Sequence, residues 1–118
     1  MKLEIRGVKE RGTSSERLVL VAKEDCDIGK YFVFLSRENN GNIVYTKISY
    51  PYWFPDTEIK KGDLIVLYSK EGKSTFKTNK DGTKSYFYYR GSTTPIYTEK
   101  DMSLVIEANT WDMEKQQP

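Results

Sequence analysis

The turn around Gly62 constrains the fold of this chain more than any other feature. Residues 60–63 read Lys-Lys-Gly-Asp, and five apolar residues, 64–68, follow directly. Glycine takes positive φ angles without steric cost and aspartate bonds nearby backbone groups, so these residues specify a tight turn. A short apolar run that starts at a turn indicates a buried β-strand. We therefore expect a buried strand over residues 63–70.

Turn residues divide the rest of the chain into short runs with β-type alternation. The expected strands cover residues 2–8, 16–23, 30–36, 42–49, 63–70, 74–79, 83–90 and 102–108. The Lys-Asp-Gly-Thr segment at 80–83 predicts a hairpin. No segment shows a sustained helical period of apolar residues. The pattern predicts an all-β protein, namely a single immunoglobulin-like antiparallel β-sandwich, with an OB-like partly open barrel as the alternative.

The length of 118 residues is typical of one domain. We expect residues 1–111 to form the sandwich and residues 112–118 to form a C-terminal tail. Cys26 is the single cysteine, and the start Met-Lys-Leu-Glu-Ile shows no apolar signal segment, so we expect a cytoplasmic protein. No run reaches membrane-spanning length, and we expect no membrane partner.

Four segments occur in an order that is shared with a known family. They are residues 17–21 (Arg-Leu-Val-Leu-Val), 29–35 (Gly-Lys-Tyr-Phe-Val-Phe-Leu), 53–68 with Trp-Phe-Pro and Lys-Lys-Gly-Asp, and 101–106 (Asp-Met-Ser-Leu-Val-Ile). Over residues 16–111 the chain resembles lamin-tail domains and their bacterial relatives. The resemblance implies an immunoglobulin-like sandwich that serves as a binding or scaffolding module without catalytic residues. The family's Leu-x-Gly-Trp turn is missing, and residues 42–49 stand in its place.

The residue types make catalysis and metal binding improbable. Histidine is absent, and one cysteine cannot complete a zinc site, so the usual general bases and ligand sets are missing. The acidic cluster at 24–27 lacks the glycine and distal glutamate of a calcium loop, and we expect a solvated turn there. Acidic neighbours should raise the pKa of the Cys26 thiol, which we expect to be structural. We expect no enzymatic activity, metal or cofactor.

Residues 70–90 mix basic and aromatic side chains, as a single-stranded nucleic-acid platform does. The candidate nucleic-acid face is Lys73, Lys77, Lys84, Tyr86, Tyr88 and Arg90. We favour a charged hairpin whose lysines discourage edge-to-edge aggregation. The net charge of +2 predicts weak binding to nucleic acid at most.

The aromatic segment at 50–55 has two interpretations. It can form a groove for an extended peptide, or its large aromatic side chains can fill a core that has few aliphatic residues. We favour the core position. The residues expected to be buried are Trp53, Phe54, Leu64, Val66 and Leu20.

Several strands are apolar on both faces. In a two-layer sandwich the outer face of each sheet meets solvent, so a strand needs apolar residues on its inner face only. We expect one outward row to meet a protein partner or a second copy of the chain through Val33, Ile65, Phe87 and Tyr89. The favoured function is a non-enzymatic protein-interaction or scaffolding module of bacterial or phage origin. A small-ligand or sugar-binding sandwich is the second alternative after nucleic-acid binding.

Overall fold

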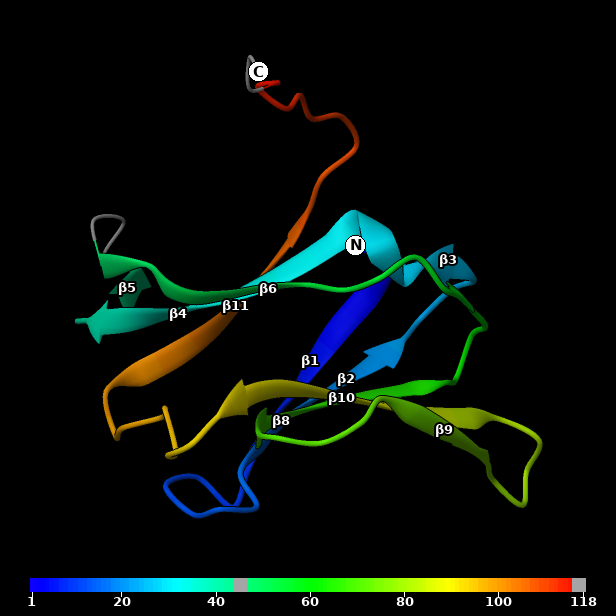
Figure 1. Cartoon of the computed structure of the whole chain (residues 1–118), viewed down its shortest axis with the longest axis horizontal. Coiled ribbons are helices and arrows are strands. Elements are labelled where there is room, and N and C mark those ends of the chain that lie inside the picture. The colour runs from blue at the N-terminus through cyan, green and yellow to red at the C-terminus, as the bar shows by residue number, and fades with distance from the viewer. Residues whose placement is uncertain (44–46, 116–118) are drawn as a thin grey trace.

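Two packed β-sheets make up the protein, whose computed structural model describes residues 1–43 and 47–115 (Figure 1). The five-stranded sheet has the order β1 (Leu3–Lys9), β2 (Arg17–Ala22), β8 (Leu64–Lys70), β10 (Lys84–Ser92) and β9 (Thr75–Thr78). The four-stranded sheet contains β11 (Asp101–Glu107), β4 (Tyr31–Asn39), β5 (Asn42–Ile43) and β6 (Ser49–Trp53). A small sheet pairs β3 (Cys26–Asp27) with β7 (Glu58–Ile59), beside a 3-10 turn, η1 (Ile28–Lys30). The expected all-β sandwich is confirmed.

Each of the eight expected strand regions contains a strand, although the boundaries differ. The region 42–49 contains β5 and the first residue of β6, and residues 44–46 lie outside the described part of the chain. β6 was not expected because it contains Pro51, which cannot donate to a ladder. The structure tolerates this proline because β6, within the described residues, pairs with β4 alone. β3 and β7 have two residues each, too few for a periodic pattern.

One strand pair departs from the antiparallel arrangement. β8 and β10 pair in parallel, with Ile65 opposite Tyr86 and Leu67 opposite Tyr88. The pair is parallel because the chain passes from β8 to the outer strand β9 and then reverses at the 80–83 turn into β10. The other strand pairs of the described residues are antiparallel, as expected. No pair among them joins the two larger sheets, so these sheets do not close into the alternative barrel.

The core lies between the two larger sheets. It is built from alternate residues of facing strands, chiefly Leu18, Leu20, Tyr31, Val33, Ile65, Leu67 and Tyr88. Of the expected core residues, Leu20, Phe54 and Val66 are buried, and Leu64 is half-buried. The prediction for Trp53 is wrong, because its side chain is 45% exposed. Trp53 pairs with Phe32 on the outer face of β4, whereas the next residue, Phe54, turns into the core.

The turn predicted around Gly62 is present. Gly62 has a φ of 92°, and the Asp63 N–H donates to the Lys60 carbonyl at 3.0 Å. The buried Asp63 carboxylate accepts hydrogen bonds from the N–H groups of Lys60 and Lys84, both at 2.8 Å. Asp63 therefore stabilises its own turn and also holds the first residue of β10 beside it.

A second buried carboxylate was not foreseen as a structural centre. Glu16 is fully buried and accepts hydrogen bonds from Ser69 Oγ at 2.5 Å, from the Ile96 N–H at 2.7 Å and from the Gly12 N–H at 2.9 Å. It thereby joins the start of β2 to β8 and to the connection between β10 and β11.

Candidate interaction surfaces

The outer face of the four-stranded sheet carries a continuous apolar row. Val33 and Leu35 of β4 are buried, and alternate residues of a strand point to opposite faces, so Phe32 and Phe34 lie on the outer side. In the register with β11, Leu104 lies opposite Phe34 and Ile106 lies opposite Phe32. We call this surface the aromatic face, made up of Phe32, Phe34, Trp53, Met102, Leu104 and Ile106.

Ring contacts hold the aromatic face together. Phe32 makes edge-to-face contacts with Phe34, at a centroid distance of 5.7 Å, and with Trp53, at 5.2 Å. The Trp53 Nε1–H donates to the Gly29 carbonyl at 2.6 Å, which fixes the indole while 45% of the side chain stays exposed. Trp111, 63% exposed, contacts the Trp53 ring at 5.1 Å. The face thus presents preorganised aromatic rings to solvent.

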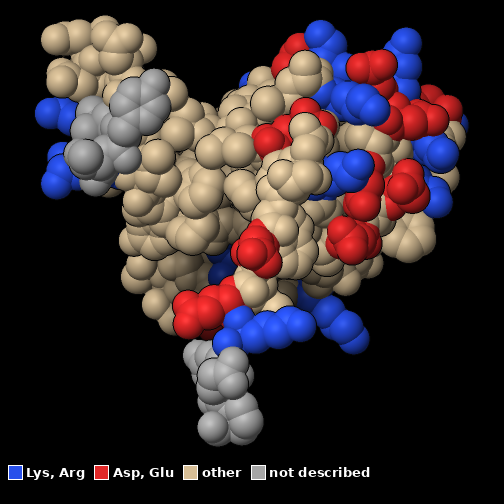
Figure 2. Space-filling model, turned by 90° about the horizontal axis from the view of Figure 1, so that it is seen from above, with Lys and Arg blue, Asp and Glu red and all other residues tan. Residues whose placement is uncertain are grey.

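Charge is unevenly spread on this side of the molecule. Figure 2 views the protein from the side of β4, β6 and β11, and its acidic and basic side chains gather toward the right half. Uncharged residues cover much of the left half. None of the six residues of the aromatic face is charged.

The outer face of the five-stranded sheet is also apolar, but neighbouring groups of the same chain cover it. It carries Val19, Leu64, Val66, Tyr68, Phe87 and Tyr89. Arg17 and Lys70 lie over the Tyr68 ring, at 5.8 and 5.1 Å, and Lys77 lies over the Phe87 ring at 6.0 Å. The Gly72 backbone lies so close to Tyr89 that an added Cβ would be 2.4 Å from its ring. This face is therefore less available to a partner.

The predicted interaction residues are divided by the fold. Phe87 and Tyr89 are half-buried on the outer side of β10, as expected. The prediction for Val33 and Ile65 is wrong, because both are fully buried core residues. The sequence indicated correctly that β4 and β8 have two apolar rows. It did not reveal which row of each strand faces the opposite sheet.

The residues of the expected nucleic-acid face are also separated. Lys84, Tyr86 and Tyr88 lie on one side of β10, where Tyr86 is half-buried and Tyr88 is buried. Lys77 points to the opposite side, over Phe87. Lys73 lies in the connection between β8 and β9. The six residues therefore do not form one exposed platform.

Arg90 lies near the end of β10 and is half-buried. Its Nη1 donates to the Tyr50 carbonyl, and its Nη2 is buried without a hydrogen-bond partner in the described structure. Burial lowers the pKa of Arg90, and the neighbouring Tyr97 opposes that shift. Such a guanidinium is not placed to bind phosphate groups from solvent.

A hollow of about 380 Å³ lies under the β9–β10 hairpin. We call it the hairpin hollow, and its side chains include Pro55, Thr57, Phe76, Lys84, Tyr86 and Tyr88. Phe76 is 55% exposed, and its ring lies 5.8 Å from the Tyr86 ring. Lys84 Nζ lies 5.1 Å from the Phe76 centroid. Phe76 is one of the aromatic residues of the 70–90 segment and is exposed here, but it is not among the six residues of the candidate nucleic-acid face. Its register opposite Tyr86 is the signal that would have identified it.

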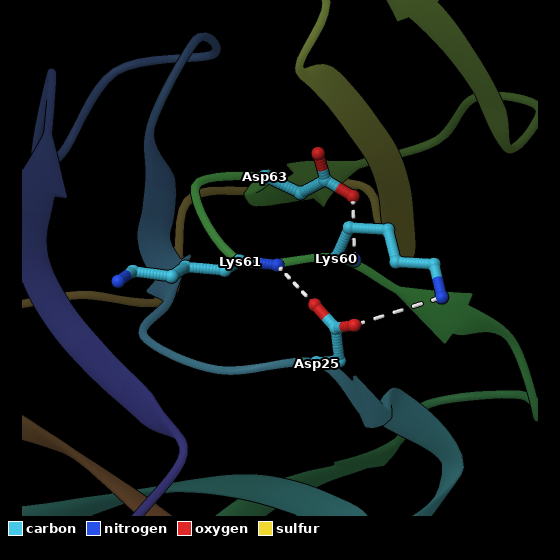
Figure 3. Close-up of polar contacts among 4 residues, drawn as sticks. All are labelled: Asp25, Lys60, Lys61 and Asp63. Atoms are coloured by element: carbon cyan, nitrogen blue, oxygen red, sulfur yellow. Dashed lines mark hydrogen bonds and ion pairs between the residues drawn. The ribbon is translucent and has the colours of Figure 1, made fainter.

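The acidic cluster at 24–27 organises turns (Figure 3). Asp25 Oδ1 accepts a hydrogen bond from the Lys61 N–H at 2.9 Å, and its Oδ2 lies 3.7 Å from Lys60 Nζ. The bond from Lys61 lowers the pKa of Asp25. Asp27 accepts hydrogen bonds from the N–H groups of Gly29 and Thr57. Within residues 1–43 and 47–115, no group of three or more His, Cys, Asp or Glu side chains is placed to hold a metal ion.

Cys26 is buried and is not paired in a disulfide. Burial is the main cause that raises the pKa of its thiol, and the charges of Glu58 and Asp27 add to the shift. The expected rise of the Cys26 pKa is present, but burial contributes more to it than the acidic neighbours do.

Comparisons with protein-family models, with curated proteins and with solved structures give no match. The described part of the chain contains no helix with the length and apolar character needed to cross a membrane.

Proposed function

We propose that this chain is a non-enzymatic protein-interaction module that binds a partner protein through the aromatic face. The observation that carries the proposal is the outward row of aromatic and aliphatic side chains. Within it, Trp53 is 45% exposed and Ile106 is 39% exposed. Tryptophan and phenylalanine are enriched in protein interfaces, and their burial supplies much of the binding energy. The resemblance to lamin-tail domains implies the same class of function.

The composition of the aromatic face favours a protein over a nucleic acid as partner. Nucleic-acid affinity depends on lysine and arginine contacts to phosphates, and none of the six residues is charged. A rigid apolar centre with charged residues to one side instead fits the usual anatomy of a protein interface.

The test compares two baits that differ only at the surface. The wild-type chain and a Phe34→Glu, Leu104→Glu variant are used to capture proteins from an extract of the native host. Any captured protein is then purified and titrated by calorimetry. We expect the variant to lower the association constant by at least about tenfold, because it places two charges in the centre of the interface.

The matched control adds the same two charges at exposed loop positions, as Ser14→Glu, Thr93→Glu. We expect the control to bind the partner as wild type does. Equal binding by the aromatic-face variant, shown by denaturation to be folded, would exclude this face as the binding site.

A further inference from the structure

The exposed edge of β9 and the hairpin hollow lie side by side. β9 pairs with β10 in a register that places Phe76 opposite Tyr86 and Lys77 opposite Ser85. The Asn79 N–H donates to the Thr83 carbonyl at 2.7 Å, so this pair is a hydrogen-bonded position of the ladder. Because such pairs alternate in antiparallel ladders, the N–H and C=O groups of Phe76 and Thr78 point toward the free edge.

The two faces of β9 differ in chemistry. Phe76 lies on the side of the hairpin hollow, and Lys77 lies on the opposite side, over Phe87. The surroundings are basic, with Lys73, Lys77, Lys80 and Lys84 on or beside the hairpin. Among the described residues, none of these four lysines takes part in an ion pair. A strand added at this edge would meet the hollow, whose aromatic rings are bordered by Lys84, on one side and the unpaired charge of Lys77 on the other.

The C-terminal segment of the chain has the matching pattern. Trp111 and Met113 alternate with Asp112 and Glu114, and all four side chains are exposed. If this segment is extended, the apolar pair lies on one side and the acidic pair on the other. Within residues 1–43 and 47–115, neither Asp112 nor Glu114 takes part in an ion pair.

We propose that the segment 108–115 of one copy of the chain adds as a strand to the β9 edge of a second copy. Trp111 and Met113 then face the hairpin hollow, and Asp112 and Glu114 face Lys77 and its neighbours. Main-chain hydrogen bonds supply affinity, and side-chain pockets supply specificity, as in other strand additions. Opposite charges at the contact favour this occupant over a neutral peptide.

The fold makes this contact intermolecular. The segment after β11 rises away from the sheets on the side of the four-stranded sheet, whereas β9 is an outer strand of the other sheet (Figure 1). A segment that binds a different surface on the next copy forms a heterologous contact, which produces open head-to-tail chains. Trp111 contacts the Trp53 ring of its own chain at 5.1 Å, so the proposed contact takes Trp111 away from the aromatic face and leaves that face free for its own partner.

Sedimentation velocity of the full chain at increasing concentration and at two salt concentrations tests the proposal. We expect the average mass to rise with protein concentration and to fall with added salt, because the contact is partly electrostatic. An edge variant (Lys73→Glu, Lys77→Glu), changed on the side of β9 away from the hollow, and a tail variant (Asp112→Lys, Glu114→Lys) should each weaken association by at least about tenfold. A Lys9→Glu, Lys61→Glu control, which makes the same charge change at exposed positions, should associate as wild type does.

Mixing the two variants gives the sharper result. The edge variant has an acidic edge and an acidic tail, and the tail variant has a basic edge and a basic tail. In a mixture every tail therefore meets an edge of opposite charge, and the two variants should associate into alternating chains. The chain that carries all four substitutions should recover association, because the charges are exchanged.

Four outcomes would overturn the proposal. They are a monomer at all concentrations, association that persists in both variants, a tail variant that associates as wild type does, and a mixture that remains monomeric. Loss of association in the Phe34→Glu, Leu104→Glu variant alone would instead assign the contact to the aromatic face.

Discussion

Glu16 is the residue on which the connection between β10 and β11 most depends. Its carboxylate accepts hydrogen bonds from the N–H groups of Gly12 and Ile96 and from the hydroxyl of Ser69, and no solvent reaches it. A buried donor that loses its acceptor costs about 1 to 3 kcal/mol. The sequence alone presents Glu16 as an ordinary polar residue at the start of a strand.

We expect Glu16→Ala to lower the free energy of unfolding by about 3 kcal/mol or more, because several buried donors lose their acceptor together. Glu24→Ala, at an exposed position of the same residue type, should change it by less than about 0.5 kcal/mol. Urea denaturation of both variants measures the difference. A loss below about 1 kcal/mol for Glu16→Ala would show that water replaces the carboxylate at low cost.

Tyr31 gives a prediction for alkaline pH. Burial, with the nearby charge of Glu107, raises its pKa from 10.0 to about 12. The folded protein keeps this proton between pH 10 and about 12, where the unfolded chain has released it. The contribution of the Tyr31 proton to the free energy of unfolding is therefore complete below pH 10 and is lost as the pH rises through about 12.

We therefore expect the urea midpoint of the wild-type protein to fall over this interval and to fall less in Tyr31→Phe, which has no phenol to titrate. The decline should remain in part, because burial also raises the pKa values of Tyr52, Tyr88 and Tyr97. Tyr50→Phe, at an exposed position, is the matched control and should keep the wild-type slope. An identical slope in Tyr31→Phe would rule out Tyr31 as a source of the decline.

At the scale of the element, β6 and the residue that follows it show how one position decides between core and surface. Trp53 lies opposite Phe32 on the outer face of β4, and Phe54 lies in the core against Tyr88, with ring centroids 5.2 Å apart. The two residues are adjacent, and both are large and aromatic. Hydropathy does not distinguish them, and only the pairing with β4 assigns their directions.

The two truncations should therefore differ in cost. We expect Phe54→Ala to lower the free energy of unfolding by about 3 to 5 kcal/mol, as large aromatic truncations in cores do. Trp53→Ala should cost about 1 to 2 kcal/mol, because it loses one hydrogen bond and only partly buried surface. Guanidinium denaturation of the two variants measures both values. A larger loss for Trp53→Ala than for Phe54→Ala would contradict the outward position of the indole.

The turns, in contrast, could be predicted from local sequence. The Asp81-Gly82 pair forms the expected hairpin, with Gly82 at a φ of 88° and Asp81 Oδ1 accepting from the Thr83 N–H at 3.0 Å. Gly62 likewise has the expected positive φ. These features depend on the conformational freedom of glycine and on hydrogen bonds within a few residues, so they do not require the rest of the fold.

At the scale of the whole molecule, the positive charges are dispersed. Lys77 and Lys84 lie on opposite faces of the β9–β10 hairpin, Arg90 is half-buried and donates to the Tyr50 carbonyl, and the net charge is +2. Nucleic-acid affinity requires several simultaneous phosphate contacts. The molecule offers few such contacts on any one face.

We expect a fluorescein-labelled single-stranded oligonucleotide to bind with a dissociation constant weaker than about 1 μM at physiological salt, and binding should decrease as salt is added. Fluorescence anisotropy measures it. Submicromolar affinity that is lost in a Lys73→Glu, Lys77→Glu, Lys84→Glu variant would show that the hairpin binds nucleic acid and would favour that function.

The sequence by itself determined the secondary-structure class, the main turns and the presence of two apolar rows on β4, β8 and β10. These properties follow from alternation, glycine positions and residue type, all of which are local. The tertiary structure decided the parallel pairing of β8 with β10, the inward position of Val33 and Ile65, and the outward position of Phe32 and Trp53. When both faces of a strand are apolar, the hydropathy of its residues does not show which of the two rows is buried. Only contact with the opposite sheet selects the row that is buried.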